Sequence, residues 1–173
     1  ERVRLGVPHP EVTWRETPSA RREAMIDNGE VDLIAATYSI NAARSKKVSF
    51  GGPYLVTYQG LMVRADDNTI DELADLDKGK KLCSVTGSTP AQNVKAQLPA
   101  VQLQEYDSYS ACVEALRRDK VDAVTTDDAI LAGMVAQAAA GDREDVVVQE
   151  AGIDQAADDV GHAAGRVEVV HVA

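Results

Sequence analysis

One segment, Gly29–Gly60, constrains the fold of this chain more than any other part of the sequence. It begins with an apolar run at 31–36 that predicts a buried strand, and it ends within a second apolar run at 58–64 that predicts another. A polar loop that contains Arg44 follows the first of these strands. Small ligands bind beyond the carboxyl ends of strands in open α/β sheets. We therefore expect the function of the chain to lie near residues 38–44.

Downstream of this segment, strand-like and helix-like segments alternate. Apolar runs at 81–85, 101–106 and 120–125 each precede a segment in which apolar residues have helical spacing. Such alternation predicts a sheet that is covered by helices on both faces, and we place this doubly wound lobe at residues 66–145.

Upstream, the segment Val12–Thr17 alternates like a strand, and Pro18 is typical of the start of a helix. The pair Asn28-Gly29 should end that helix. With the strand at 31–36, this pattern predicts a strand-helix-strand unit whose two strands are parallel. A strand-like run at 167–172 has no predicted partner.

Composition argues against several classes of function. Lys and Arg number 18 against 28 Asp and Glu, which gives a formal charge of -10, whereas a nucleic-acid partner requires a basic surface. No run approaches the roughly 18 apolar residues that span a bilayer. The three histidines, His9, His162 and His171, are scattered and predict no metal site, and no serine stands in a nucleophile motif. We predict neither a cofactor nor a catalytic residue.

Charged and hydroxyl side chains gather where the predicted strands end. Arg44 offers a rigid fork of donors that suits a carboxylate, although a solvated loop arginine would look the same in sequence. The turn Thr86–Pro90 precedes a helix and suits an anion, unless Ser88 or Thr89 simply caps that helix. Asp127 follows a later strand and either faces a ligand or caps the next helix.

The segment around Arg44 resembles the solute-binding proteins of bacterial ABC importers for polar amino acids, which form extracellular solute-binding protein family 3. The matching positions are Asp32, Ser39, Ile40, Arg44, Val48, Phe50, Pro53 and Tyr54. The resemblance extends over about Val12 to Gln149. Two further blocks, TGSTPAQN and DAVTTDDAILAG, resemble the glutamate-binding branch of this family.

This resemblance implies an α/β fold of the type II periplasmic-binding-protein class, in which a hinge joins two doubly wound lobes. It divides the chain into a partial lobe one at 1–65, lobe two at 66–145, and a return hinge with an atypical tail at 146–173. The family's first strand and helix have no counterpart here. We therefore expect lobe one to be incomplete in this chain.

The resemblance also implies a ligand-binding role for seven residues. In the family, an arginine and hydroxyls from both lobes hold the α-carboxylate of the ligand, and an aspartate accepts its α-ammonium. Residues at the end of the first strand line one wall of the ligand-binding pocket, although a tyrosine there can equally be a packing residue. Asp128 is expected to cap the helix that follows. The predicted ligand-binding residues are Thr37, Tyr38, Ser39, Arg44, Ser88, Thr89 and Asp127.

The two cysteines, Cys83 and Cys112, allow two interpretations from sequence alone. A disulfide would suit a secreted protein, whereas two buried thiols would suit a cytosolic one. The resemblance implies a disulfide, because members of the glutamate-binding branch can carry one at these positions.

The resemblance implies extracellular or periplasmic binding of a polar amino acid, with delivery to the membrane permease of an ABC importer. Glutamate is the first choice of ligand, and glutamine and aspartate stay open. We expect a monomer that is lipid-anchored to the cell surface in its full-length form and that is not an enzyme. The alternatives are a sensing domain of a larger receptor, a dehydratase on the same scaffold that uses Asp127 and Asp128, and an incomplete chain that binds nothing.

Overall fold

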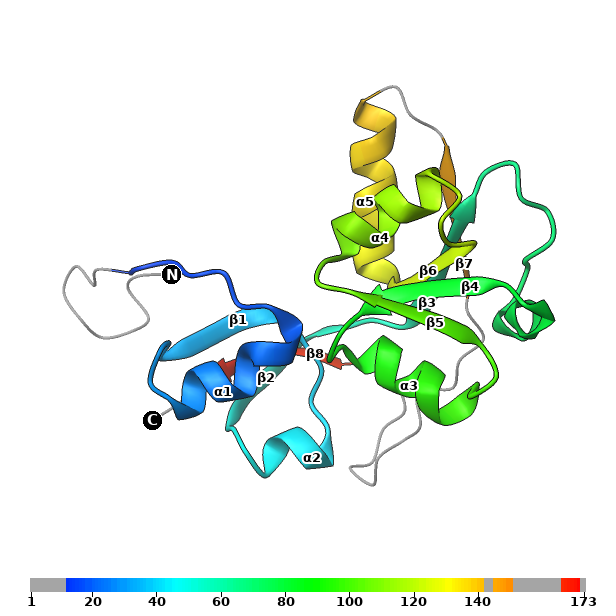
Figure 1. Cartoon of the computed structure of the whole chain (residues 1–173). Helices are drawn as coiled ribbons and strands as arrows, with labels where there is room; N and C mark the ends of the chain where they lie inside the picture. Colours follow the sequence, from blue (N-terminus) through cyan, green and yellow to red (C-terminus); the bar gives the residue numbers. More distant parts are fainter. Residues whose placement is uncertain (1–11, 142–144, 151–165, 172–173) are drawn as a thin grey trace.

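The computed structural model describes residues 12–141, 145–150 and 166–171, which form two β-sheets with helices packed on them (Figure 1). The smaller sheet has the strand order β1-β8-β2, and the larger sheet has the order β5-β4-β6-β3-β7. The strands are β1 (Leu33–Tyr38), β2 (Phe50–Val56), β3 (Gln59–Arg64), β4 (Lys81–Val85), β5 (Gln102–Tyr106), β6 (Ala123–Asp127), β7 (Val146–Glu150) and β8 (Arg166–His171). The α-helices are α1 (Arg22–Asp27), α2 (Ala42–Ser45), α3 (Thr89–Gln97), α4 (Tyr109–Arg117) and α5 (Asp128–Ala140), and the 3-10 helices are η2 (Ser19–Arg21) and η3 (Leu73–Lys78).

The smaller sheet differs from the prediction in its strand pairing. β8 lies between β1 and β2 and is antiparallel to both. The predicted strand Val12–Thr17 does not form. This segment has no regular secondary structure, no described strand pairs with it, and Trp14 is 83% exposed. The expected pair of parallel strands is therefore wrong. The partner of β1 comes instead from the strand-like run predicted at 167–172.

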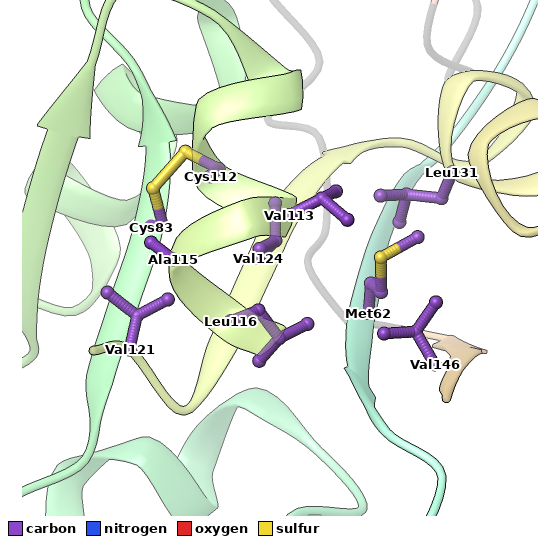
Figure 2. Packing of buried hydrophobic residues seen from close by; sticks show 10 residues of the cluster. All are labelled: Met62, Cys83, Cys112, Val113, Ala115, Leu116, Val121, Val124, Leu131 and Val146. Carbon is purple, nitrogen blue, oxygen red and sulfur yellow. A yellow bond between two sulfur atoms is a disulfide. The ribbon is translucent and has the colours of Figure 1, made fainter. Parts of the chain in front are cut away.

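The larger sheet confirms the predicted doubly wound α/β organisation. β4 is parallel to both β5 and β6, whereas β3 is antiparallel to β6 and β7. Alternate side chains of β3 enter different apolar clusters, with Leu61 and Val63 in one and Met62 in the other. Helices η3 and α3 complete the first cluster, and α4 and α5 complete the second. Figure 2 shows Met62 beside Leu131 of α5 and Val146 of β7 in the second cluster.

The strand pairing places the predicted boundary strands, β3 and β7, in the larger sheet. A boundary after residue 65 would assign β3 to lobe one, but β3 is paired between β6 and β7 in the larger sheet. β7, which we expected to act as a return hinge, is likewise an edge strand of that sheet. The structure has a smaller unit, which is built on the sheet β1-β8-β2, and a larger unit, which is built on the sheet β5-β4-β6-β3-β7. We propose that the chain crosses between these two units at Thr57 and Tyr58, which connect β2 to β3.

A disulfide between Cys83 of β4 and Cys112 of α4 fastens a helix to the larger sheet (Figure 2). Both residues are fully buried, and their Cα atoms are 5.7 Å apart. The bond closes a loop with a sequence separation of 29 residues. Because this bond restricts the unfolded chain, it should stabilise the fold by about 3–4 kcal/mol.

Replacement of both Cys83 and Cys112 by alanine should therefore lower the free energy of unfolding by about 3–4 kcal/mol. Urea unfolding of the oxidised wild-type chain and of the double variant would measure the difference. Dithiothreitol provides a control, because it should destabilise the wild-type chain and leave the variant unchanged. Equal unfolding midpoints for the two proteins would contradict a contribution of this size.

Candidate functional site

Arg44 joins the two units of the structure. Its backbone N–H donates to the side chain of Asn41 at 2.9 Å, which caps the start of α2 and fixes the position of the arginine. The Arg44 residue is only 5% exposed. Its Nη1 atom donates to the Ser39 carbonyl at 2.9 Å and to Thr89 Oγ1 at 2.8 Å. Its Nη2 atom donates to the Gly87 carbonyl at 3.2 Å, so the arginine spans from the β1–α2 loop to the β4–α3 turn.

The predicted hydroxyl residues divide into two kinds. The Thr89 hydroxyl donates to Ser39 Oγ at 2.9 Å, so these two side chains and Arg44 form one cluster. The Ser88 hydroxyl instead accepts the Ala91 N–H at 3.2 Å and caps α3. Capping was the alternative role for Ser88, whereas Thr89 faces the smaller unit. A ligand contact for Ser88 stays a prediction.

Gly87 allows the β4–α3 turn to approach the smaller unit closely. Its φ of +77° lies in the left-handed region that side chains rarely adopt. A Cβ atom at this position would lie 2.8 Å from the Cα atom of Ala20, just before α1. The turn and the start of the helical segment therefore meet backbone to backbone, at the same place where Arg44 crosses between the units.

Tyr38 lies against the arginine cluster. It is buried, and the guanidinium of Arg44 lies 4.7 Å from the centroid of its ring. Its hydroxyl donates to Glu23 Oε1 at 2.9 Å. Burial raises the pKa of the Tyr38 phenol to about 12, and the hydrogen bond to Glu23 adds to this effect. The neighbouring Thr37 side chain is exposed, and its backbone carbonyl accepts a hydrogen bond from Arg22.

Asp127 is a buried carboxylate at the carboxyl end of β6. It is 6% exposed, and no described residue donates a hydrogen bond to its side chain. Burial raises the pKa of Asp127 to about 6, the charge of Asp128 raises it further, and Arg22 and Arg44 oppose both effects. The neighbouring Asp128 accepts the Ala129 N–H at 2.6 Å at the start of α5. Asp128, which was expected to cap this helix, is its first residue, and Asp127 occupies the N-cap position without a side-chain cap hydrogen bond. The Asp127 carboxylate is left to accept a donor from elsewhere.

A buried hydrogen-bond network holds the strand ends that carry these residues. Thr125 Oγ1 donates to the Gly60 carbonyl at 2.8 Å and accepts a hydrogen bond from Gln59 Nε2 at 2.9 Å. Gln59 Oε1 in turn accepts from Asn93 of α3 at 3.0 Å. The Ser84 hydroxyl donates to the Thr125 carbonyl at 2.9 Å. These contacts tie β3, β4, β6 and α3 together, so Thr89 and Asp127 stand on a rigid base.

Sequence reasoning missed one charged residue of this site, Arg22. It is 5% exposed, and it donates from Nε to the Ser19 carbonyl at 3.3 Å and from Nη1 to the Thr37 carbonyl at 3.2 Å. Burial lowers the pKa of Arg22 to about 10, and the charge of Arg44 lowers it further. The sequence contains a signal for the burial of Arg22, because Arg22 lies on the same helical face as the apolar residues Met25 and Ile26, at positions i, i+3 and i+4.

These features define a ligand-binding protein of the two-unit periplasmic-binding class, with a polar site between its units. A solved structure of an ancestral arginine-binding protein bound to arginine matches with a TM-score of 0.81 and 26% identity, over 98% of this chain and 69% of that one. Holo ArgBP from T. maritima has the same fold, with a TM-score of 0.80 and 22% identity over 98% and 67% of the two chains. The family of bacterial extracellular solute-binding proteins, family 3, matches residues 3–140, and the chain belongs to this family.

Curated relatives of the chain are named as amino-acid-binding proteins. The glutamate-binding protein GluB of Corynebacterium efficiens is 67% identical over 132 residues, which are 76% of this chain and 45% of that protein. A glutamine-binding protein of Geobacillus stearothermophilus is 37% identical over 126 residues, or 73% of this chain and 48% of that protein. The chain thus spans about half the length of these relatives.

Within the described residues, the helices are too short or too polar to cross a membrane.

Replacement of Asp127 by asparagine should stabilise the chain at pH 8 and change its stability little at pH 4. The folded-state pKa of about 6 exceeds the ordinary 3.8, so folding favours the protonated carboxyl, and this contribution is lost as the pH rises through 6. The expected gain at pH 8 is on the order of 2–3 kcal/mol in the free energy of urea unfolding. The control is Asp66→Asn, at an exposed position. Destabilisation at pH 8, or an equal gain at both pH values, would show that burial does not raise this pKa.

Proposed function

We propose that this chain is the ligand-binding part of an extracellular receptor that captures a polar amino acid, with glutamate as the first choice, for an ABC importer. One observation carries the proposal. A buried guanidinium and two hydroxyls from two units of the structure meet in one cluster. The charge of this guanidinium also acts on Asp127, a buried carboxylate to which no described residue donates a hydrogen bond. A free amino acid presents a carboxylate and an ammonium side by side. The site offers a partner of opposite charge for each of these groups.

In this proposal the α-carboxylate of the ligand binds Arg44 and the hydroxyls of Ser39 and Thr89. The α-ammonium donates to Asp127, which is otherwise a buried carboxylate without a hydrogen-bond donor among the described residues. Hydrogen bonds to charged groups contribute about 1.5–3 kcal/mol each. Four such contacts therefore reach the roughly 8 kcal/mol that corresponds to micromolar affinity. The ligand contacts predicted for Thr37, Tyr38 and Ser88 remain part of the proposal.

The same contacts supply a mechanism for signalling that the ligand is bound. Ser39 and Arg44 belong to the smaller unit, whereas Thr89 and Asp127 belong to the larger one. A ligand that binds both units stabilises the closed arrangement and shifts the equilibrium towards it. The permease of the importer then recognises the closed form. We propose that the intact receptor is a monomer, is lipid-anchored at the cell surface, and binds its ligand without catalysis.

Glutamate is proposed because the glutamate-binding protein GluB of Corynebacterium efficiens shares 67% identity with this chain. The relative from Geobacillus stearothermophilus that is named as glutamine-binding shares 37%. Glutamine is accordingly the main competitor to be tested, and aspartate is the next.

Replacement of Arg44 by alanine should weaken glutamate binding by at least about 30-fold, because it leaves the ligand carboxylate and Asp127 without their buried cation. Isothermal titration of the 173-residue chain with L-glutamate would measure the change. The control is Lys46→Ala, which removes the same charge from an exposed position two residues away. Equal affinities of the Arg44→Ala variant and the wild-type chain would contradict the proposed carboxylate site.

Glutamate affinity should also fall by about 10-fold between pH 7.5 and pH 5, because protonation of Asp127 removes the acceptor for the α-ammonium. The sign follows from the raised pKa of about 6, below which the free carboxyl is neutral. Titrations at several pH values would show the decline, and it should disappear in Asp127→Asn. The same pH dependence in that variant would assign the effect to another group.

A further inference from the structure

We propose that Asp128 is a positioning residue that clamps the connection between β2 and β3 to the larger unit. The clamp consists of Thr57, Tyr58, Asp128 and Ala129. It moves the turning point of the two units to the bonds between Val56 and Thr57. Where it concerns ligand affinity, this inference rests on the proposed function, and it gives a role to a carboxylate that the proposed ligand contacts do not use.

The connection and the start of α5 exchange hydrogen bonds in both directions. Thr57 Oγ1 donates to Asp128 Oδ1, and the Tyr58 N–H donates to the same oxygen at 3.2 Å. In return, the Asp128 N–H donates to the Tyr58 carbonyl at 2.7 Å, and the Ala129 N–H donates to Thr57 Oγ1 at 3.4 Å. Hydrogen bonds that end on an ionised carboxylate are stronger than those between neutral groups. Both residues of the connection are therefore fixed to the larger unit.

The clamp begins abruptly at Thr57. Val56 is the last residue of β2, and it pairs with Arg166 of β8 in the smaller sheet. Thr57 is only 3% exposed, whereas Val56 is 48% exposed. Because the hydroxyl of Thr57 is buried, it would be left unsatisfied if the connection moved away from α5. One residue thus belongs to the smaller sheet, and the next belongs to the larger unit.

The start of β3 is held as closely to α5 as the connection is. A Cβ atom at Gly60 would lie 2.9 Å from Leu131 Cδ1 and 3.4 Å from the Asp128 Cα atom. Gln59 Nε2 donates to the Pro90 carbonyl at 3.4 Å, besides its bond to Thr125. The chain from Thr57 to Gly60 therefore moves with the larger unit. A rotation of the smaller unit has to take place before Thr57.

The clamp lies beside the proposed ligand site. Asp127, the proposed acceptor for the α-ammonium, directly precedes Asp128 and pairs with Gln59 in the register of β3 and β6. Arg44, the proposed partner of the α-carboxylate, belongs to the smaller unit. A loose connection would let Arg44 take up more orientations relative to Asp127. The ligand would then bind only the fraction of molecules in the closed arrangement, and its apparent affinity would fall by that fraction.

Thr57→Val tests the clamp without a change of charge. In the chain without ligand, the amides of Tyr58 and Asp128 should exchange with solvent at least about 10-fold faster than in the wild-type chain. Residue-resolved hydrogen exchange by NMR would measure this. The amide of Leu82, which is buried in β4, should exchange at its wild-type rate, so a local release is told apart from a loss of global stability. Isothermal titration should show glutamate binding weakened by about 3- to 10-fold.

Variants of Asp128 separate the contact from the charge. Asp128→Ala removes both and should weaken glutamate binding as Thr57→Val does. Asp128→Asn removes the charge but keeps an oxygen acceptor, so it should retain an affinity within about 2-fold of the wild-type value. The double variant of Thr57→Val and Asp128→Ala should bind no more weakly than either single variant, because both remove the same contact. The matched control is Asp77→Ala, at an exposed position of η3 in the larger unit.

The exchange measurement and the titration decide different parts of the proposal. Wild-type exchange at Tyr58 in Thr57→Val would overturn the clamp. Faster exchange with an unchanged glutamate affinity would overturn its role in positioning the site. A wild-type chain that binds no amino acid would overturn the proposed function, and the exchange rates, measured without ligand, would still decide whether the clamp exists. Thr57→Ser, which keeps the hydroxyl, should preserve the wild-type exchange rates, and loss of protection there would also contradict the clamp.

Discussion

The hydrogen bonds of Arg44 connect the two units, and the geometry of the site depends on them. One guanidinium nitrogen contacts both Ser39 of its own unit and Thr89 of the other, and the second contacts the Gly87 carbonyl. These contacts require a close approach of the units, which the absence of a side chain at Gly87 permits. The sheet of the larger unit has an apolar cluster on each face, and a disulfide fastens α4 to β4.

Burial of charge is the second physical constraint on the site. Arg22, Arg44 and Asp127 are each at most 6% exposed, and their pKa values shift towards the neutral forms because water is excluded. Groups of this kind reduce the stability of the fold unless a partner compensates them. For Arg44 and Asp127 that partner is, in our account, the ligand, so the same burial that weakens the empty site strengthens its contacts with a charged amino acid.

The sequence predicts those features that depend on local pattern. The strand at 81–85 forms at its predicted bounds, because every residue after the first is buried in a regular alternation of strand and helix. The cluster of Arg44, Ser39 and Thr89 was predicted from the resemblance, and the structure brings these side chains together. That they bind a ligand remains a proposal.

Features that depend on distant partners could not be predicted in the same way. Val12–Thr17 has the alternation of a strand, but a strand also needs an edge to pair with, and β8 pairs with β1 instead. Arg22 resembled a solvated helix residue because arginine is rarely buried. Its guanidinium packs on the Tyr38 ring and donates to the Thr37 carbonyl. Neither contact is local in sequence.

A crystal structure of the chain grown with L-glutamate would test the central claim most directly. Our account predicts one glutamate between the units, with its α-carboxylate on Arg44 and its α-ammonium within hydrogen-bond distance of Asp127. It also predicts that Thr89 and Ser39 contact the same ligand. A glutamate bound elsewhere on the chain, or one whose ammonium makes no contact with Asp127, would contradict the account.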